Sequence, residues 1–343
     1  MLSFAAARRP PSPLDTPAFL TPVAADLRRL DAVVRARLDS DVALVRQVSE
    51  YIVSGGGKRL RPAVLLLAAG AAGYRQRAPA ADAVPPHLEL AAVVEFIHTA
   101  TLLHDDVVDA SPLRRGRSTA NAEFGNAAAV LVGDFLYSRA FQMMVGVRNT
   151  RVMEVLADAT NTIAEGEVLQ LMNCHDPDVD EVRYLDIIRR KTAKLFEASA
   201  RLGAVLAGAP PAVEQGLAVY GMQLGTAFQL VDDVLDYSGD EATIGKSLGD
   251  DLAEGKPTLP LIRVLACGRA ADAAAVRHAI LEGGRAEFAH VLEAVRAAGA
   301  LDYARAVARR EAQAARDALA PLPASEFRDS LLELTSFSVT RSS

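Results

Sequence analysis

Apolar residues recur at steps of three and four positions along most of this chain, which is the period of an α-helix. Near the start, for example, the pattern runs through Leu27, Leu30, Val34 and Leu38. The alternation of apolar and polar residues that marks a half-buried strand does not appear at any useful length. Half of the 343 residues are apolar and only 5% are aromatic, and the abundance of alanine and leucine favours helices. The sequence therefore predicts an all-α protein.

Prolines divide the chain into two unequal parts. Residues 1–22 contain five prolines, and we expect them to form a flexible extension because proline interrupts a helix. Residues 23–343 carry helical patterning without a low-complexity linker, which predicts one helical domain. Within that domain we expect helices that begin near Pro62 and His87, and further helices near 120–147, 151–173, 181–208, 211–237, 257–267, 270–298, 301–320 and 325–341.

Charge and cysteine content exclude several classes of protein. The net charge of −6 implies no basic surface, so nucleic acid is not an expected partner. Cys174 and Cys267 are too few for a disulfide framework and are expected to be reduced thiols. No apolar run approaches the ~20 residues of a membrane span, and the N-terminus has no apolar core of signal-peptide length. We therefore expect a cytoplasmic protein without a membrane span.

Two acidic clusters with the same spacing follow apolar, helix-like runs. They consist of Asp105, Asp106 and Asp109 and of Asp232, Asp233 and Asp236. The first and last carboxylates of each cluster lie one helical turn apart on one face. Three acids this close repel one another, and divalent cations would relieve the repulsion. Ligands that are all oxygen favour Mg²⁺, which also binds substrate phosphates. One cluster alone is typical of a solvated helix face, but two matching clusters predict a pair that holds a diphosphate.

Two basic segments could bind phosphate. Residues 55–57 are glycines, and the cations Lys58, Arg59 and Arg61 follow at an expected helix start, where backbone N–H groups favour anions. The spacing is not that of a nucleotide-binding P-loop, and a basic helix start on the surface is the alternative. Residues 114–117, with the sequence RRGR, either neutralise the first acidic cluster or complete a diphosphate site.

Several segments together resemble the trans-polyprenyl diphosphate synthases, from about residue 24 to the end of the chain. They are GGGKRLRP, FIHTATLLHDDVVDASPLRRG, VLVGDFLYSRAFQMM, AEGEVLQLMN, RRKTAKLFEAS, GTAFQLVDDVLDYSGD and GDDLAEGKPTLPL. Within that family the resemblance is nearest to the bacterial enzymes that make octaprenyl chains. It implies a single-domain bundle of about ten core helices around a deep central cavity, assembled as a homodimer.

The resemblance also implies residue roles. Two or three Mg²⁺ ions would be bound with the allylic diphosphate, and their protein ligands would be Asp105, Asp109 and Asp232 among the six catalytic aspartates. Isopentenyl diphosphate would be held by Lys58, Arg61, His98 and Arg115. The allylic diphosphate would be contacted by Arg114, Lys191, Thr192, Gln229, Lys246 and Lys256, with Lys191 also counted as catalytic. By pattern alone, His98 would be an ordinary core histidine.

The implied reaction is the head-to-tail condensation of isopentenyl diphosphate onto an allylic diphosphate, giving a long all-trans chain. An octaprenyl (C40) product for a quinone side chain is expected, with peripheral membrane contact during product release. Ala100 and Thr101 precede Asp105 by about 6–7.5 Å along the helix, where family members with short products carry a bulky aromatic residue. Phe141, Met143 and Met144 could form a deeper floor or be ordinary core residues.

Three other readings differ in testable ways. A class I terpene cyclase also ionises an allylic diphosphate at an aspartate motif, but it needs no second diphosphate site such as residues 55–61. A non-catalytic subunit of a partner synthase would usually lack one of the two acidic motifs, and both are present here. A purely structural helical scaffold would leave the six acids in apolar surroundings without an explanation.

Overall fold

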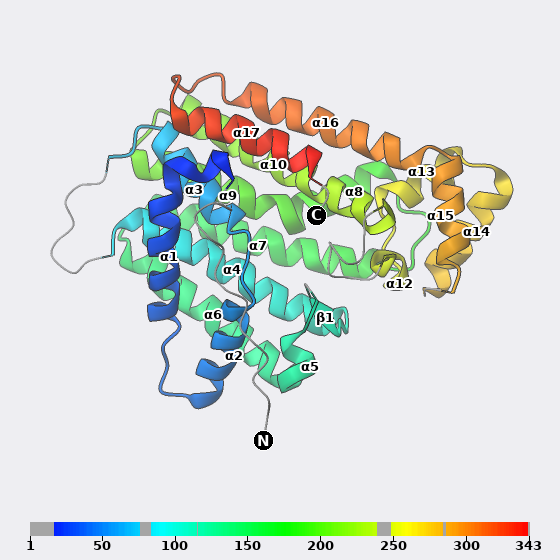
Figure 1. The fold of residues 1–343 in the computed structure, drawn as a ribbon, viewed down its shortest axis with the longest axis horizontal. Helices are drawn as coiled ribbons and strands as arrows, with labels where there is room; N and C mark the ends of the chain where they lie inside the picture. The colour runs from blue at the N-terminus through cyan, green and yellow to red at the C-terminus, as the bar shows by residue number, and fades with distance from the viewer. Residues whose placement is uncertain (1–16, 76–83, 115, 239–247, 284–285, 342–343) are drawn as a thin grey trace.

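The computed structural model describes residues 17–75, 84–114, 116–238, 248–283 and 286–341, and these residues form a bundle of α-helices (Figure 1). The helices are α1 (Ala24–Arg37), α2 (Ala43–Ser54), α3 (Leu60–Ala71), α4 (Pro86–Val108), α5 (Ala120–Phe124), α6 (Asn126–Gly146), α7 (Thr150–Asn173), α8 (Glu181–Ile188), α9 (Lys194–Ala207), α10 (Pro211–Ser238), α12 (Asp250–Ala253), α13 (Leu259–Cys267), α14 (Ala270–Glu282), α15 (Phe288–Ala297), α16 (Ala300–Ala318) and α17 (Glu326–Thr340). The prediction of an all-α fold is confirmed.

The long helices lie side by side, and α4 is among the most deeply buried of them. Figure 1 shows α16, α17 and α10 along one side and α7, α4 and α6 beneath them, while α1 crosses one end and α13–α15 close the other. Helix α10 packs on α9 and α16, and α4 packs on α6 and α3. Every residue of α4 from His87 to Ile97 is buried, so this helix is a rigid support for what it carries at its C-terminus.

The folded part of the chain begins earlier than the proline pattern predicts. Ala18–Val23 form a 3₁₀ helix, η2, in which Phe19, Leu20 and Val23 are buried. Phe19 packs against Phe337 of α17 with ring centroids 5.2 Å apart. Residues 18–22 are therefore folded and were wrongly included in the expected flexible extension, because a short 3₁₀ helix tolerates the proline at position 22 that would interrupt a longer α-helix.

Turns divide some of the predicted helices. The expected helix over 120–147 is broken at Gly125, whose φ of +86° takes the chain out of helical geometry. The expected helix over 270–298 is two helices, α14 and α15. A two-stranded antiparallel hairpin, β1 (Leu113–Arg114) with β2 (Arg117–Ser118), was not predicted, since strands of two residues are too short to show an alternating pattern.

Two smaller expectations concern the surface. In the described part of the chain, none of the helices is both long and apolar enough to cross a lipid bilayer. Cys174 and Cys267 are both free thiols, as expected.

Candidate active site

The first aspartate cluster occupies the C-terminal turn of α4, and each of its acids pairs with a cation from another element. Lys191 Nζ lies 3.6 Å from Asp105 Oδ2. Lys256 Nζ lies 3.0 Å from Asp109 Oδ2. Asp106 is buried and accepts two hydrogen bonds from the Arg114 guanidinium, at 2.7 and 2.9 Å. These contacts bring the cluster together with residues that are distant in sequence.

The second cluster lies near the C-terminus of α10 and is more enclosed. Asp233 is buried and accepts hydrogen bonds from the Tyr184 hydroxyl and from Gln229 Nε2. Asp236 accepts backbone N–H groups of residues 250 and 251 at the start of α12. Burial raises the pKa of both carboxyls to about 8, and Asp251 adds to the effect. The third acid, Asp232, pairs with Arg341 at 2.6 Å.

Short chains of contacts connect the two clusters. Thr192 Oγ1 donates to Gln229 Oε1 at 3.1 Å, and Gln229 in turn donates to Asp233 in the second cluster. Thr192 follows Lys191, which reaches Asp105 in the first. A second link runs through Lys256. Its backbone N–H donates to the Asp251 carbonyl, the Asp251 N–H donates to Asp236 of the second cluster, and Lys256 Nζ reaches Asp109 of the first. The structure therefore places the two aspartate clusters at one site, as the matching spacing predicted.

A π-helical turn, η3 (Arg189–Ala193), presents Lys191 and Thr192 to this site. The turn sits between two glycines on neighbouring helices. A Cβ atom on Gly166 of α7 would lie 2.6 Å from the Lys191 backbone nitrogen, and a Cβ on Gly225 of α10 would lie 2.6 Å from Ala193 Cα. Both glycines are required by this close approach, and π-turns of this kind frequently occur at functional sites.

The two lysines of the site are held in the charged state. Lys191 Nζ also lies 2.6 Å from Glu167 of α7. Although burial lowers the pKa of Lys191, Asp105 and Glu167 outweigh it and the pKa is raised. The pKa of Lys256 is raised in the same way by Asp109, Asp251 and Glu254 against the effect of burial. Burial raises the pKa of Glu167 to about 7, the nearby Lys191 opposing it.

A second group of cations lies where the expected glycine turn leads into α3. Arg61 Nη1 is 3.2 Å from His98 Nε2 of α4, and the guanidinium stacks over Phe196 at 4.4 Å. Burial lowers the pKa of Arg61 to about 10, while Glu95 and Asp232 act in the opposite direction. Its Nε is buried and has no hydrogen-bond partner among the residues that the structure describes. Lys58 is exposed in the preceding turn. Arg61 thus offers a desolvated donor to an anion, and His98 contacts it.

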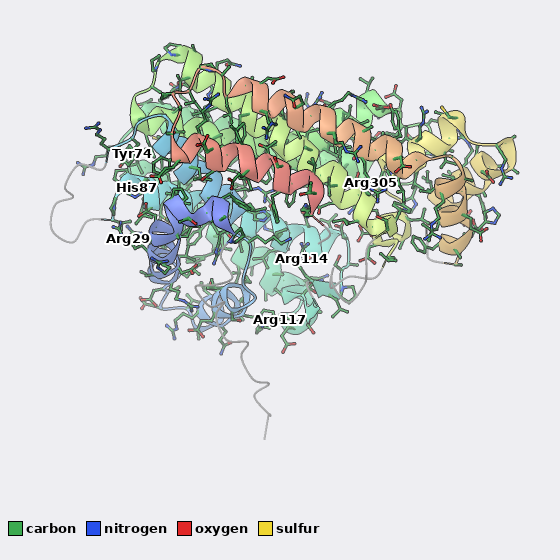
Figure 2. The ribbon with its side chains drawn as sticks, turned by 45° about the horizontal axis from the view of Figure 1, so that its top comes forward. Arg29, Tyr74, His87, Arg114, Arg117 and Arg305 are labelled. Carbon is green, nitrogen blue, oxygen red and sulfur yellow. The ribbon has the colours of Figure 1, made fainter. Side chains whose placement is uncertain are left out.

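Of the remaining predicted residues, Arg114 lies in the described part of the chain and two others do not. Arg114 neutralises Asp106 in this structure, which is one of the two roles that the sequence left open. Figure 2 shows Arg114 and Arg117 together on the hairpin, away from Tyr74 and His87, which lie at one end of the bundle. Arg115 and Lys246 lie outside the described residues.

The carboxylates fit a divalent cation. Within the described ranges, no three His, Cys, Asp or Glu side chains are close enough together to hold an ion by themselves. Asp105, Asp109 and Asp232 have side chains that are 18%, 20% and 42% exposed, so these three can reach a ligand, whereas Asp106 and Asp233 are bonded within the protein. Such a set suits Mg²⁺, which takes one or two carboxylates and completes its shell with water and phosphate oxygens.

Two open pockets lie beside the site and do not coincide with it. One has a volume of about 570 Å³ and is lined by Arg189, Arg190 and Lys194 among others. The other has a volume of about 580 Å³ and is lined by Asp178, Arg183 and further residues of the α8 region. Neither pocket is lined by an aspartate of the two clusters. Although both are large, neither is therefore the active site. The deep central cavity stays a prediction.

Sequence reasoning missed several polar residues of the site. Tyr184, Glu167, Glu254 and Arg341 each contact a predicted residue directly. Each stands alone in its local sequence, without a spacing that marks it. Glu167 and Glu254 carry a weak signal, because they lie within the segments AEGEVLQLMN and GDDLAEGKPTLPL that contributed to the resemblance.

The expected chain-length residues lie on α4 just before the first cluster. Ala100 is fully buried, and the Thr101 hydroxyl donates to the backbone oxygen of His98. Phe141 is 39% exposed and stacks on Tyr137, so it does not form a floor within the bundle. Met143 and Met144 are buried in the core.

Comparisons with known proteins agree with this geometry. Residues 42–297 match the family model described as polyprenyl synthetase. The chain is 52% identical to the octaprenyl diphosphate synthase of Escherichia coli (strain K12), over 93% of this chain and 96% of that protein. It is 45% identical to the all-trans-nonaprenyl-diphosphate synthase (geranyl-diphosphate specific) of Rhodobacter capsulatus, over 94% and 97% of the two chains.

A solved structure is also similar. It is the polyprenyl synthase from Caulobacter crescentus CB15 complexed with calcium and isoprenyl diphosphate, with a TM-score of 0.89 and 45% identity over 95% of this chain and 97% of that one. The protein described here therefore belongs to the polyprenyl synthetase family, whose members are prenyltransferases.

Proposed function

We propose that this protein is a long-chain all-trans-polyprenyl diphosphate synthase that joins isopentenyl diphosphate head to tail to an allylic diphosphate. The observation that carries the proposal is the placement of three accessible carboxylates, Asp105, Asp109 and Asp232, around one site with two charged lysines, Lys191 and Lys256. This arrangement suits a diphosphate that is bound from both sides.

The residues of the two clusters have separate tasks. Asp105, Asp109 and Asp232 would hold two or three Mg²⁺ ions, which supply positive charge to the diphosphate that leaves. Asp106 and Asp233 fix the geometry of each cluster through their bonds to Arg114 and Tyr184. The accessible acids are thus ligands, and the enclosed acids keep the ligands in place.

Cations of the chain stabilise charge as it develops on the leaving group. Lys191 and Lys256 stay protonated because acids surround them, and each would donate to phosphate oxygens when the substrate displaces its carboxylate partner. Thr192 and Gln229 add polar contacts next to Lys191, and Arg114 and Lys246 belong to the same proposed set. Donors fixed before the reaction stabilise its transition state without reorganisation.

The second substrate, isopentenyl diphosphate, would bind at the N-terminal end of α3. Lys58, Arg61, His98 and Arg115 form its proposed diphosphate site. Among the described residues the buried Nε of Arg61 has no hydrogen-bond partner, so a bound anion would give this donor a partner. Holding both substrates places the alkene next to the allylic carbon, so that a bimolecular step becomes effectively unimolecular. In this proposal the path along which the growing chain is bound determines the trans geometry and the length of the product.

We further propose an octaprenyl (C40) product for a quinone side chain. The support is the similarity to synthases of octaprenyl and nonaprenyl chains, together with the small side chain of Ala100 below the first cluster. A cytoplasmic homodimer is proposed, with peripheral membrane contact for product release. Exposed apolar residues on α6 and α7, such as Leu131, Val145, Val168 and Leu171, suit contact with a second copy.

Product analysis tests the proposal. The purified protein alone is incubated with radiolabelled isopentenyl diphosphate, farnesyl diphosphate and Mg²⁺, and the products are separated by reverse-phase chromatography. We expect elongation to a long chain centred on C40, and no product when the metal is chelated. Cyclic hydrocarbons, or elongation only after a partner protein is added, would contradict the proposal.

A further inference from the structure

We propose that His175 is a positioning residue that holds Lys256 against Asp109 by fixing the turn on which the lysine sits. The inference rests on the proposed function, in which Lys256 contacts the allylic diphosphate. His175 follows the C-terminus of α7 by two residues, and Lys256 lies in the turn after α12, so the contact joins segments that are distant in sequence.

His175 contacts the turn through both its backbone and its ring. Its backbone N–H donates to the Gly255 carbonyl at 2.8 Å. The imidazole lies so close over Gly255 that a Cβ atom there would collide with it. A Cβ on Gly283 would lie 2.8 Å from the same ring. The ring therefore fills the space that two glycines leave, one of which directly precedes Lys256.

The ring is itself fixed. Nδ1 of His175 lies 3.0 Å from the backbone carbonyl of Ile280 in α14, and because a carbonyl only accepts, Nδ1 carries the proton. The residue adopts a φ of +60°, a left-handed conformation that non-glycine residues adopt rarely, although histidine does so more often than most. Backbone conformations of this type persist where the surrounding contacts require them. Here the contacts required are those that place the imidazole on Gly255.

The turn transmits this position to the lysine. The Lys256 N–H donates to the Asp251 carbonyl at 2.8 Å, and its own carbonyl accepts the Thr258 N–H at 3.0 Å. The backbone of Lys256 is thus fixed by its N–H, by its carbonyl and by the preceding Gly255. Only the side chain remains to be ordered. Its Nζ lies 3.0 Å from Asp109 and 2.5 Å from Glu254. The end of α7 thus fixes Lys256, just as Glu167 on the same helix fixes Lys191.

A double-mutant cycle tests this role. His175→Gly keeps the left-handed φ and the backbone N–H but removes the ring, and His175 lies at the surface, so the core stays intact. We expect KM for farnesyl diphosphate to rise about tenfold while KM for isopentenyl diphosphate stays within about twofold. In a Lys256→Met background the same change should have no further effect. An equal loss in both backgrounds, or no loss with Lys256 present, would overturn the inference.

Amide hydrogen exchange gives a readout that does not depend on activity. In substrate-free protein, the peptides that span residues 248–262 should exchange faster in His175→Gly, while those of α4 should not change. The matched control is Arg148→Gly, which also removes an exposed side chain at a left-handed position and should leave kinetics and exchange in 248–262 unchanged. Unaltered exchange in His175→Gly would refute the contact. Failure of the wild-type protein to elongate farnesyl diphosphate would instead refute the proposed function.

Discussion

The six aspartates of the two clusters differ in how much water reaches them. Asp106 and Asp233 are 4% and 1% exposed and are bonded within the protein. Asp105, Asp109 and Asp232 are partly exposed, and their ion-pair partners in the described part of the chain are cations that a ligand can displace. Matching sequence spacing identifies all six but cannot separate the two kinds, because the difference arises from Arg114, Tyr184 and other partners that carry no motif of their own.

Replacing an accessible acid tests its role directly. We expect Asp105→Ala and Asp232→Ala each to reduce turnover by about two to three orders of magnitude, since one electrostatic stabiliser of the transition state is removed. Helicity measured by circular dichroism should not change. Asp302→Ala is the control, because Asp302 has an 89% exposed side chain and its ion-pair partner among the described residues is Arg305. Near-normal turnover of either site variant at saturating Mg²⁺ would rule out the assignment.

The sequence pattern was sufficient to predict some of the elements around the site and not others. Periodicity predicted the long helices because the spacing of their apolar residues identifies the face that is buried. It also located both acidic clusters on helices. It could not locate the π-turn at Lys191, which depends on the approach of Gly166 and Gly225 from other helices. The break between α14 and α15 was missed for a different reason. Gly283 and Gly284 mark it in the sequence, but the stretches on both sides keep a helical period.

A single methyl group tests the π-turn. Gly166→Ala should lower kcat/KM about tenfold or more, because the new Cβ would lie 2.6 Å from the Lys191 backbone nitrogen and shift the turn that carries Lys191 and Thr192. The substitution would otherwise favour the helix by about 1 kcal/mol. Gly146→Ala is the matched control, since a Cβ at Gly146 meets nothing within 4 Å. Steady-state kinetics with unchanged values for Gly166→Ala would show that the close approach has no functional consequence.

The first turn of α4 carries a buried titratable group far from the site. Burial lowers the pKa of His87, and the nearby Asp26 only partly opposes the effect. The unfolded chain therefore binds this proton more readily than the folded protein does. The contribution of neutral His87 to the free energy of unfolding is fully present above the ordinary histidine pKa of about 6.5. It is lost as the pH falls below that value.

Thermal unfolding between pH 7 and pH 5 should show this dependence. We expect the melting temperature of His87→Gln to fall less over that interval than that of the wild type. His278→Gln, at an exposed histidine, should follow the wild-type curve. A His87→Gln curve parallel to the wild type would mean that His87 does not contribute to the pH dependence of folding.

The whole bundle places the two clusters at one site and surrounds α4 with other helices. The product chain is expected to grow along α4 away from Asp105, within this enclosure. The length and direction of that path were taken from the resemblance, because no local pattern in the sequence encodes a cavity that several helices line jointly.

Product length tests the path. Ala100 precedes Asp105 by about 7.5 Å along the helix. With geranyl diphosphate as the primer, Ala100→Tyr should therefore shorten the main product to roughly farnesyl size, as measured by reverse-phase chromatography. Ala100→Val should give products of intermediate length, which separates a filled path from a misfolded core. An unchanged product distribution in an active Ala100→Tyr enzyme would show that the chain does not pass this residue.

The central claim is that the two aspartate clusters share metal ions with one diphosphate. A crystal structure with Mg²⁺ and an unreactive thio analogue of an allylic diphosphate tests it most directly. We predict metal ions bound by Asp105 and Asp109 on one side of the diphosphate and by Asp232 on the other, with Lys191 and Lys256 donating to its oxygens. Ions bound by only one cluster, or a diphosphate bound away from both, would contradict the claim.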